Sequence, residues 1–323
     1  MGEAPTVAIL GTRYIDFTVE EDILGPHGVV LTSGDGASGD AIVEQASSAG
    51  VVLAGSRPRF DAPTLARLRC RGIVRYGVGV EKIDLEAAAR AGIWVAYVPD
   101  YGTDAVALHS VTLMLTCLRR VPQADAVVKA GGWGFAELRP LRTPEALTVG
   151  IVGFGRIGRR VADFLSPFGF QLMATDAFVD VESAAPGVRS VAFDELLSRA
   201  DVVTLHAPGH ADGAPLIGRD EIKLFKPGSV IVNTARGSLV DASALVAGLE
   251  EGRPGFAALD VFEQEPPVER FGAVADRVVL TPHMAWYTQE SELDLRTKAA
   301  REALRILQGD APLNPVAKPK GAA

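Results

Sequence analysis

Short apolar runs alternate with amphipathic stretches along most of this chain of 323 residues. Apolar runs separated by helical stretches are typical of a parallel sheet that helices cover on both faces. In the first hundred residues the runs predict strands at 7–10, 28–31, 51–54, 72–76 and 94–97. Further along they predict strands at 172–175, 202–206, 230–233, 256–259 and 278–281. The pattern therefore predicts an α/β fold with doubly wound parallel sheets.

Helical periodicity is clearest in two segments. One runs from residue 104 to about 121, and Pro122 is expected to stop or kink it. The Gly- and Pro-rich segment 131–144 is predicted to be an irregular arm. A last helix is expected at roughly 291–307, and residues 311–323 are expected to be extended or disordered.

Composition narrows the class of protein. The net charge of −8 and the lack of long basic runs argue against nucleic acid or an anionic membrane as a partner. No apolar run is long enough to span a bilayer, and the N-terminus lacks a signal-like core, so we expect a cytoplasmic protein. The two cysteines, Cys70 and Cys117, predict buried thiols and no metal site.

A glycine-rich turn is the most informative local motif. The apolar segment 147–152 leads into Gly153, Gly155 and Gly158 and then into a helical stretch. This spacing brings backbone N–H groups and a helix N-terminus together, which suits a pyrophosphate. A glycine triplet alone could serve any tight turn, but the flanking strand and helix favour a dinucleotide site.

The acid that completes this motif is Asp176, which follows the next predicted strand. It lies 176 − 158 = 18 residues past the last glycine. An acid at this distance accepts hydrogen bonds from a ribose and repels a 2′-phosphate, so the sequence predicts NAD in preference to NADP. The alternative is an ordinary turn residue at a strand end.

Three polar residues, Arg236, Glu265 and His283, follow predicted strands of the second series. A guanidinium can clamp a carboxylate, and an imidazole can exchange a hydroxyl proton near neutral pH. A carboxylate beside that imidazole fixes its orientation and favours its protonated form. Taken singly, these residues could be a surface charge, a solvating acid and a loop histidine.

The segments 232–241, 258–266 and 281–283 together resemble the catalytic signatures of the D-isomer-specific 2-hydroxyacid dehydrogenases. Similarity to that family extends from about residue 72 to residue 307. The resemblance implies a Rossmann NAD domain, residues 103–288, inserted into a flavodoxin-like substrate-binding domain, residues 1–102 plus 289–323. It also implies a homodimer formed through the helix from residue 104 and the 131–144 arm.

The resemblance also implies roles for individual residues. Arg236 would bind the substrate carboxylate, His283 would be the acid/base, and Glu265 would keep its ring protonated. Asp260 would hold the nicotinamide carboxamide. Cofactor contacts are implied at Gly153, Gly155, Arg156, Ile157, Gly158, Asp176, His206, Ala207, Pro208, Thr234, Ala235 and Asp260.

Residues 281–287 are similar to the branch that contains the C-terminal-binding-protein corepressors and their bacterial relatives. In that branch an arginine matching Arg75 reaches the substrate, the backbone at Val78 and Gly79 helps, and a tryptophan matching Trp286 lines the pocket. Trp286 could instead pack at a domain interface. The chain departs from the family pattern at two positions, Leu108 and Glu81.

The function that these observations favour is hydride transfer between NAD(H) and the C2 carbon of a small 2-oxo or 2-hydroxy acid. Two alternatives stay open. One is an NAD(H)-responsive binding protein with little turnover, and the other is a phosphoglycerate-type dehydrogenase, although no regulatory domain is expected after residue 323. His109 is expected to pack within its helix, whereas His27 and His210 are expected in exposed loops.

Overall fold

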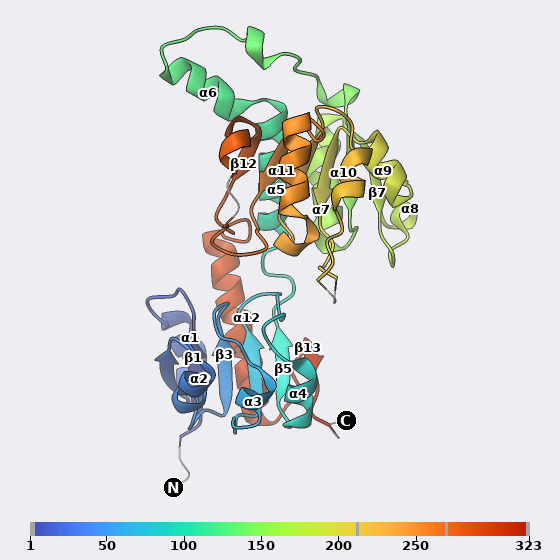
Figure 1. The fold of residues 1–323 in the computed structure, drawn as a ribbon. Helices are drawn as coiled ribbons and strands as arrows, with labels where there is room; N and C mark the ends of the chain where they lie inside the picture. The colour runs from blue at the N-terminus through green and yellow to red at the C-terminus, as the bar shows by residue number, and fades with distance from the viewer. Residues whose placement is uncertain (1–3, 211–212, 269–270, 321–323) are drawn as a thin grey trace. The chain divides into compact units, whose positions relative to one another are not determined.

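The computed structural model describes residues 4–210, 213–268 and 271–320. The chain folds into two compact units, shown in Figure 1. Unit 1 comprises Met1–Gly102 and Thr288–Ala323, and unit 2 comprises Thr103–Tyr287. Each unit has its own sheet and its own core.

Unit 2 is built on a parallel sheet of seven strands within the described residues, in the order β12-β11-β10-β9-β6-β7-β8. This is the order of a doubly wound fold, and it reverses between β6 and β9. The strands are β6 (Thr148–Val152), β7 (Gln171–Thr175), β8 (Arg189–Ser190), β9 (Val202–Leu205), β10 (Val230–Asn233), β11 (Phe256–Leu259) and β12 (Val278–Leu280).

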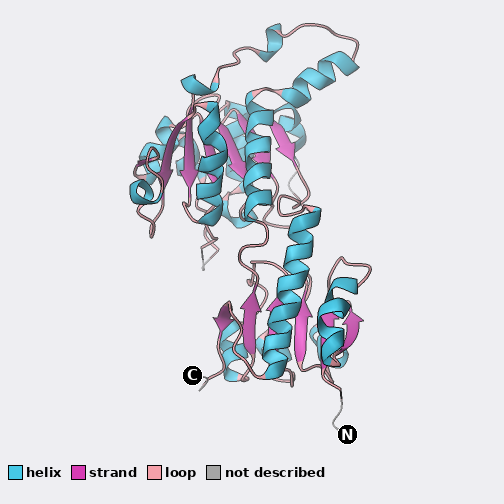
Figure 2. Ribbon diagram, turned by 180° about the vertical axis from the view of Figure 1, so that it is seen from behind, coloured by secondary structure: helices cyan, strands magenta, loops and turns pink. Residues whose placement is uncertain are grey.

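Helices cover both faces of this sheet (Figure 2). Val149 and Ile151 face one core, and Val152 faces the other, so the strands are apolar on both sides. The α-helices are α5 (Thr103–Leu118), α6 (Val121–Lys129), α7 (Arg156–Leu165), α8 (Val181–Ala184), α9 (Phe193–Arg199), α10 (Arg219–Leu224) and α11 (Ala242–Glu251). Short 3-10 turns are η2 (Ala136–Leu138), η3 (Pro144–Ala146), η4 (Ser166–Phe168), η5 (Gly237–Leu239) and η6 (Phe271–Arg277).

Unit 1 has a sheet of six strands within the described residues, in the order β13-β5-β4-β3-β1-β2. Its parallel part has the flavodoxin-like order 2-1-3-4-5, and β13 pairs antiparallel with β5. The strands are β1 (Thr6–Leu10), β2 (Val30–Gly34), β3 (Val51–Ala54), β4 (Gly72–Arg75), β5 (Trp94–Tyr97) and β13 (Pro315–Ala317). The prediction of an α/β fold with two doubly wound sheets is confirmed.

The helices of unit 1 come from both ends of the chain. Helix α12 packs on α1 and on the central strands, so the C-terminal part of the sequence completes the N-terminal core. The helical elements are α1 (Thr18–Leu24), η1 (Gly25–His27), α2 (Gly39–Gln45), α3 (Ala62–Leu65), α4 (Leu85–Arg90) and α12 (Gln289–Gln308).

Polar side chains fix where several helices begin. Asp84 accepts a hydrogen bond from the amide of Ala87, and Asp241 accepts one from Ala244, both at 2.9 Å. Thr288 and Ser291 form a capping box that starts α12. Helix α12 therefore begins at the residue where the chain enters unit 1.

Two sequence predictions differ from the structure. The strand expected at 28–31 begins only at Val30, because Gly28 takes a left-handed conformation that ends η1. The helix expected from 104 to about 121 ends at Leu118. Arg120 has a positive φ of 50°, and Pro122 lies in the first turn of α6, where a proline costs no helical hydrogen bond.

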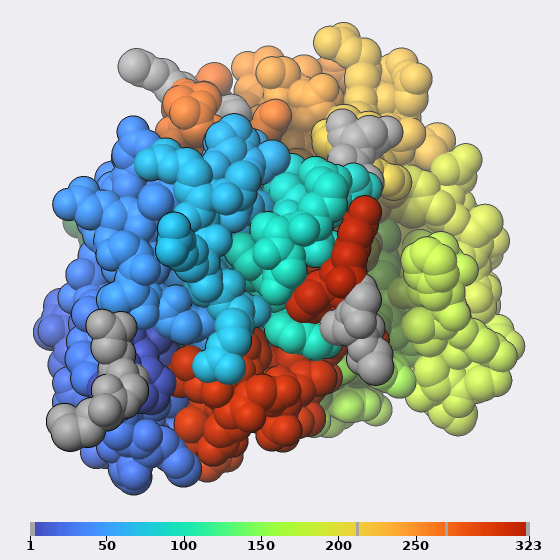
Figure 3. Space-filling view, turned by 90° about the horizontal axis from the view of Figure 1, so that it is seen from below, coloured from blue at the N-terminus to red at the C-terminus, as the bar shows by residue number. Residues whose placement is uncertain are grey.

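The tail is expected to be extended or disordered from residue 311, and within it residues 315–317 are extended and paired in the sheet as β13. Pro315 pairs with Ala96, and Ala317 pairs with Val95. The amide of Lys320 donates to the carbonyl of Ala89 in α4. Figure 3 shows this C-terminal segment in red against the teal surface of the α4 region. Residues 321–323 lie outside the described residues.

Among the described residues, no helix combines the length and apolar character needed to cross a bilayer. Cys70 and Cys117 are unpaired and buried, as predicted. Burial raises the pKa of each thiol to about 12. In the described part of the chain, His, Cys, Asp and Glu side chains form no group of three or more that could hold a metal ion.

We predict that Ala317→Asp destabilises the protein. Ala317 is 8% exposed and belongs to the core of unit 1, so the new carboxylate would be buried. Urea unfolding should show a loss of about 2 kcal/mol or more. Lys318→Asp is the matched control, because Lys318 is exposed, and an equal loss in both variants would contradict a structural role for β13.

Candidate active site

The predicted site residues of unit 2 follow the carboxyl ends of parallel strands. Gly153 follows β6, His206 follows β9, and Asp260 follows β11. In a parallel sheet these ends share one edge, and ligands bind there at the point where the strand order reverses. In this sheet the reversal lies between β6 and β9, next to the glycine-rich turn.

Each of the three glycines occupies a different environment. Gly153 has a φ of +88°, and a Cβ there would lie 2.6 Å from the amide nitrogen of Ala207. A Cβ on Gly158 would lie 2.1 Å from the carbonyl oxygen of Gly153. A Cβ on Gly155 would have nothing within 4 Å. Two glycines are thus required by packing, and the open space beside Gly155 lies at the N-terminus of α7, the place where the sequence predicts the pyrophosphate.

Asp176 links the end of β7 to this turn. Its Oδ2 accepts from the amide of Phe154 at 2.6 Å, and its Oδ1 accepts from Phe178 and Val179. Partial burial opposes ionisation, but these three hydrogen bonds outweigh it and lower the pKa of Asp176. Asp176 is therefore a turn residue, and its negative charge lies beside the glycine-rich turn. This geometry is compatible with both interpretations of the sequence, an acceptor for a ribose and an ordinary turn residue.

His206 lies against the same turn, since its carbonyl carbon is 2.6 Å from where a Gly153 Cβ would be. Burial lowers the pKa of its imidazole to about 3, so the ring is neutral. The Nε2 atom is 2.9 Å from Thr204 Oγ1. The Nδ1 atom is buried, with no hydrogen-bond partner among the described residues. A neutral ring is compatible with the cofactor contact that the family resemblance implies for His206, and that contact stays a prediction.

The loop after β10 carries Arg236. Buried Asn233 accepts from the amide of Ala235 and donates to the carbonyl of Arg236, which fixes the backbone. The half-buried guanidinium donates from Nη1 to the Ala235 carbonyl at 2.8 Å. A Cβ on Gly237 would lie 1.9 Å from the carbonyl carbon of Phe262. The Arg236 loop therefore contacts the backbone that leads to Glu265.

Glu265 and His283 form a direct pair. Glu265 Oε2 is 2.8 Å from His283 Nδ1, and its Oε1 accepts from the amide of Phe262 at 3.3 Å. His283 has a φ of 52°, a conformation that non-glycine residues seldom adopt and that is common at functional sites. This contact leaves Nε2 as the ring atom that can exchange a proton with a ligand.

Asp260 holds the His283 loop. Its carboxylate is fully buried and accepts from the hydroxyl of Thr281 at 2.6 Å. It also accepts from the amides of Met284 and Ala285, both at 2.9 Å. The backbone carbonyl of Asp260 accepts from the amide of His283. Its main contacts are thus with its own loop, and its contact with a nicotinamide stays a prediction.

The other predicted residues occupy distinct places. Trp286 is half-buried and donates from its indole nitrogen to the His283 carbonyl at 3.1 Å. Arg75, Val78 and Gly79 belong to unit 1, at the end of β4 and in the loop after it. Arg75 Nη1 donates to the Tyr76 carbonyl, and Val78 is 42% exposed.

Comparison with known proteins identifies the family to which this chain belongs. Residues 111–285 match the family model described as "D-isomer specific 2-hydroxyacid dehydrogenase, NAD binding domain". The chain belongs to the D-isomer specific 2-hydroxyacid dehydrogenase family. Unit 2 thus contains the NAD-binding domain of the family, and the membership expected from the three motifs is confirmed. The corepressor-like branch stays a prediction.

Individual relatives carry several names. A glyoxylate reductase of Thermofilum pendens is 38% identical over 266 residues, covering 79% of this chain and 77% of that protein. A D-3-phosphoglycerate dehydrogenase of Archaeoglobus fulgidus is 34% identical over 291 residues, or 89% of this chain. The chain spans 55% of the length of that relative. The D-lactate dehydrogenase structure from Aquifex aeolicus, complexed with NAD and lactic acid, is 26% identical, with a TM-score of 0.86 over 97% of this chain and 99% of that one.

Sequence reasoning missed two positioning residues of this family member. His109 was expected only to pack within its helix, but its Nε2 lies 3.2 Å from Thr281 Oγ1 and 3.7 Å from Asp260 Oδ1. Thr281 was part of a motif without a role of its own. Thr234 likewise bonds Ser110 of α5, at 2.6 Å between hydroxyls. His27 and His210 are both exposed, as predicted, but only His210 lies in a loop, because His27 ends the 3-10 helix η1.

We predict that Gly155→Ala weakens NADH binding without destabilising the apo protein. The open space at Gly155 accepts a methyl group in the absence of a ligand, but that methyl group would block close approach of a pyrophosphate. Calorimetric titration should show Kd rising at least about tenfold. Gly272→Ala is the control, because its surroundings are equally open. Unchanged affinity in Gly155→Ala would argue against this placement of the cofactor.

Proposed function

We propose that this family member is an NAD-dependent D-2-hydroxyacid dehydrogenase. It would transfer hydride between NAD(H) and the C2 carbon of a small 2-oxo or 2-hydroxy acid. The observation that carries the proposal is the 2.8 Å contact between His283 Nδ1 and Glu265 Oε2. An imidazole oriented by a carboxylate is suited to exchanging a hydroxyl proton near neutral pH. Family membership supports the same reaction.

Each residue of the candidate active site has a separate role in the proposed reaction. His283 donates the proton from Nε2 to the substrate oxygen, and Glu265 stabilises the protonated ring. Bound NADH supplies the hydride. Arg236 holds the substrate carboxylate and neutralises the negative charge that grows on the oxygen. Arg75, Val78 and Gly79 of unit 1 are likewise proposed as contacts of the substrate carboxylate, as the family resemblance implies. Oxidation of the hydroxy acid reverses these steps.

The cofactor preference proposed is NADH over NADPH. Asp176 supports it, because its lowered pKa keeps a negative charge beside the glycine-rich turn. A 2′-phosphate at the neighbouring ribose would meet that charge. A cytoplasmic location is also part of the proposal, and two buried thiols without a disulfide agree with a reducing compartment.

The substrate is proposed only as a class. Relatives are named for glyoxylate, lactate and 3-phosphoglycerate, which are all small 2-oxo or 2-hydroxy acids or their phosphorylated forms. A phosphoglycerate-type role is the alternative within this class, because the phosphoglycerate dehydrogenases are among the relatives that the chain matches.

A panel of 2-oxo acids tests the activity and the cofactor together. Glyoxylate, pyruvate, 2-oxoisocaproate and 3-phosphohydroxypyruvate are each assayed with NADH and NADPH by loss of absorbance at the nicotinamide band. We expect turnover of at least one acid, with kcat/KM for NADH exceeding that for NADPH. Binding of NADH without oxidation by any acid would instead favour a nucleotide-responsive binding protein.

Two variants test the residue roles. His283→Asn should lower kcat of reduction by at least about 100-fold, because the proton donor is lost. Arg236→Lys should lower kcat/KM about tenfold or more, because a point charge does not reproduce the bidentate fork. His27→Asn is the control, since His27 is exposed in unit 1. Near-wild-type kcat in His283→Asn would remove the proton-donor role.

We also propose a homodimer formed through α5, α6 and the 131–144 arm. Several apolar side chains on this segment are exposed in the single chain: Val121, Val128, Trp133, Phe135 and Leu141. The most exposed of these side chains is Trp133, which is 93% exposed. A surface of this kind is typical of a protein interface.

Light scattering tests the dimer. The wild-type chain should have about twice the 34.0 kDa mass of one chain, and Trp133→Ser should raise the dimer Kd at least about tenfold. Phe178→Ser is the control, because Phe178 is 96% exposed outside the arm. A monomeric wild-type protein, or equal effects of the two variants, would contradict the proposed interface.

A further inference from the structure

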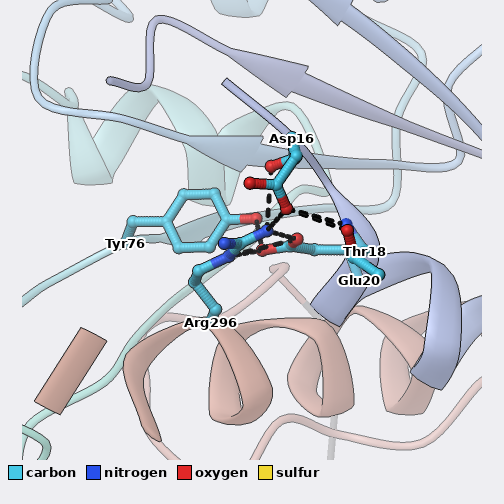
Figure 4. Close-up of polar contacts among 5 residues, drawn as sticks. All are labelled: Asp16, Thr18, Glu20, Tyr76 and Arg296. Atoms are coloured by element: carbon cyan, nitrogen blue, oxygen red, sulfur yellow. Dashed lines mark hydrogen bonds and ion pairs between the residues drawn. The ribbon is translucent and has the colours of Figure 1, made fainter. Parts of the chain in front are cut away.

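A buried polar cluster lies within unit 1, and none of its side chains has been given a role so far (Figure 4). Its centre is Glu20 of α1, whose side chain is fully buried. Tyr76, which follows β4, and Arg296 of α12 both contact Glu20. We call Tyr14, Asp16, Glu20, Tyr76 and Arg296 the Glu20 cluster. It joins residues of the first hundred positions to a residue of the last helix.

The contacts within the Glu20 cluster are short and mutually consistent. Arg296 donates from Nη2 to Glu20 Oε2 at 2.6 Å and from Nε to Glu20 Oε1 at 3.0 Å. The hydroxyl of Tyr76 donates to Glu20 Oε1 at 2.8 Å. Arg296 Nη2 also donates to the carbonyl of Asp16 at 2.9 Å, and its guanidinium carbon lies 4.7 Å from the centre of the Tyr14 ring.

Electrostatics keep Tyr76 a hydrogen-bond donor. Burial, together with the negative charge of Glu20, raises the pKa of the Tyr76 hydroxyl well above its usual value. The hydroxyl therefore stays protonated at any physiological pH. A buried ion pair contributes little net stability compared with apolar packing of the same volume. Stability alone is thus a weak reason for the Glu20 cluster.

Tyr76 connects this cluster to the predicted substrate loop. It lies between Arg75 and Gly77, and Val78 and Gly79 follow. Its carbonyl accepts from Arg75 Nη1, and its amide donates to the Ala54 carbonyl at 2.9 Å. The turn continues at Gly77, with a φ of +125°. The phenol of Tyr76 is hydrogen-bonded to Glu20, and its backbone carbonyl accepts a hydrogen bond from Arg75. The orientation of Tyr76 therefore links the position of the Arg75 guanidinium to that of the Glu20 carboxylate.

We propose that Tyr76, Glu20 and Arg296 are positioning residues that orient the loop 75–79 for binding the substrate carboxylate. This inference rests on the proposed function, in which Arg75, Val78 and Gly79 contact that carboxylate. Arg296 fixes the Glu20 carboxylate, Glu20 fixes the Tyr76 hydroxyl, and Tyr76 fixes the backbone carbonyl that receives the Arg75 guanidinium. None of the three touches the reacting atoms.

The test compares two tyrosines of the cluster. Tyr76→Phe removes the hydroxyl that donates a hydrogen bond to Glu20. Tyr14→Phe removes a hydroxyl from the neighbouring ring, which packs edge-on against Tyr76 with 5.4 Å between the ring centroids. For the best 2-oxo acid of the panel, Tyr76→Phe should raise KM about tenfold, with kcat and the KM for NADH within about twofold of wild type. Tyr14→Phe should leave all three within about twofold.

A double-mutant cycle separates positioning from general stability. Glu20→Leu with Arg296→Met removes both buried charges and the hydrogen-bond acceptor of Tyr76, so no unpaired buried charge remains, and Asp16, which also pairs with Arg296, is exposed to water. It should raise KM about as much as Tyr76→Phe, and adding Tyr76→Phe to it should change KM by less than about twofold. Unfolding in urea is measured alongside, since a purely structural cluster would lower stability and leave KM unchanged.

The outcomes distinguish this inference from the proposed function. Turnover by the wild-type chain with an unchanged KM in Tyr76→Phe overturns the positioning role and leaves the proposed function intact. Additive effects on KM in the cycle overturn it as well. Absence of wild-type turnover with every acid overturns the proposed function and this inference with it. If the double variant does not fold, the comparison of Tyr76→Phe with Tyr14→Phe decides alone.

Discussion

The buried carboxylate of Asp260 is the constraint on which the candidate active site depends. A charge with no exposure is tolerated only where donors surround it, and three donors from residues 281–285 do so. Those donors belong to the loop that carries His283. The hydrogen bonds to the Asp260 carboxylate therefore fix this loop. They hold His283 at its positive φ and place its imidazole opposite Glu265.

Backbone contacts made possible by glycines hold the remaining loops of unit 2. Gly153 lets the turn after β6 lie against the loop after β9, and Gly237 lets the Arg236 loop lie against Phe262. A side chain at either position would overlap main-chain atoms, which cannot move aside as a flexible side chain can. The relative positions of these loops are thus set by rigid contacts, which suits groups that must meet one ligand together.

Much of the fold could be predicted because its determinants are local. Apolar runs mark strands buried on both faces, and the three-glycine spacing marks a tight turn in which Gly153 and Gly158 leave no room for a side chain. Details went unpredicted where a contact with a distant residue or a local backbone conformation decided them. Residues 315–317 have no strong strand pattern, yet they pair with β5 because that edge of the sheet is available to them. The helix from Thr103 ends at Leu118, before Pro122, and the left-handed Arg120 that follows is not revealed by any periodicity.

The sequence by itself determined the α/β class, the dinucleotide turn and the three residue types of the proposed reaction, because each depends on residues that are close together in the sequence. Only the tertiary structure revealed that His109 and Thr281 support Asp260, and that Arg296 meets Glu20 across 276 positions of the chain. Hydrogen bonds between such distant residues leave no periodic trace in a single sequence. Their partners are chosen by how the strands and helices pack, which local propensity does not encode.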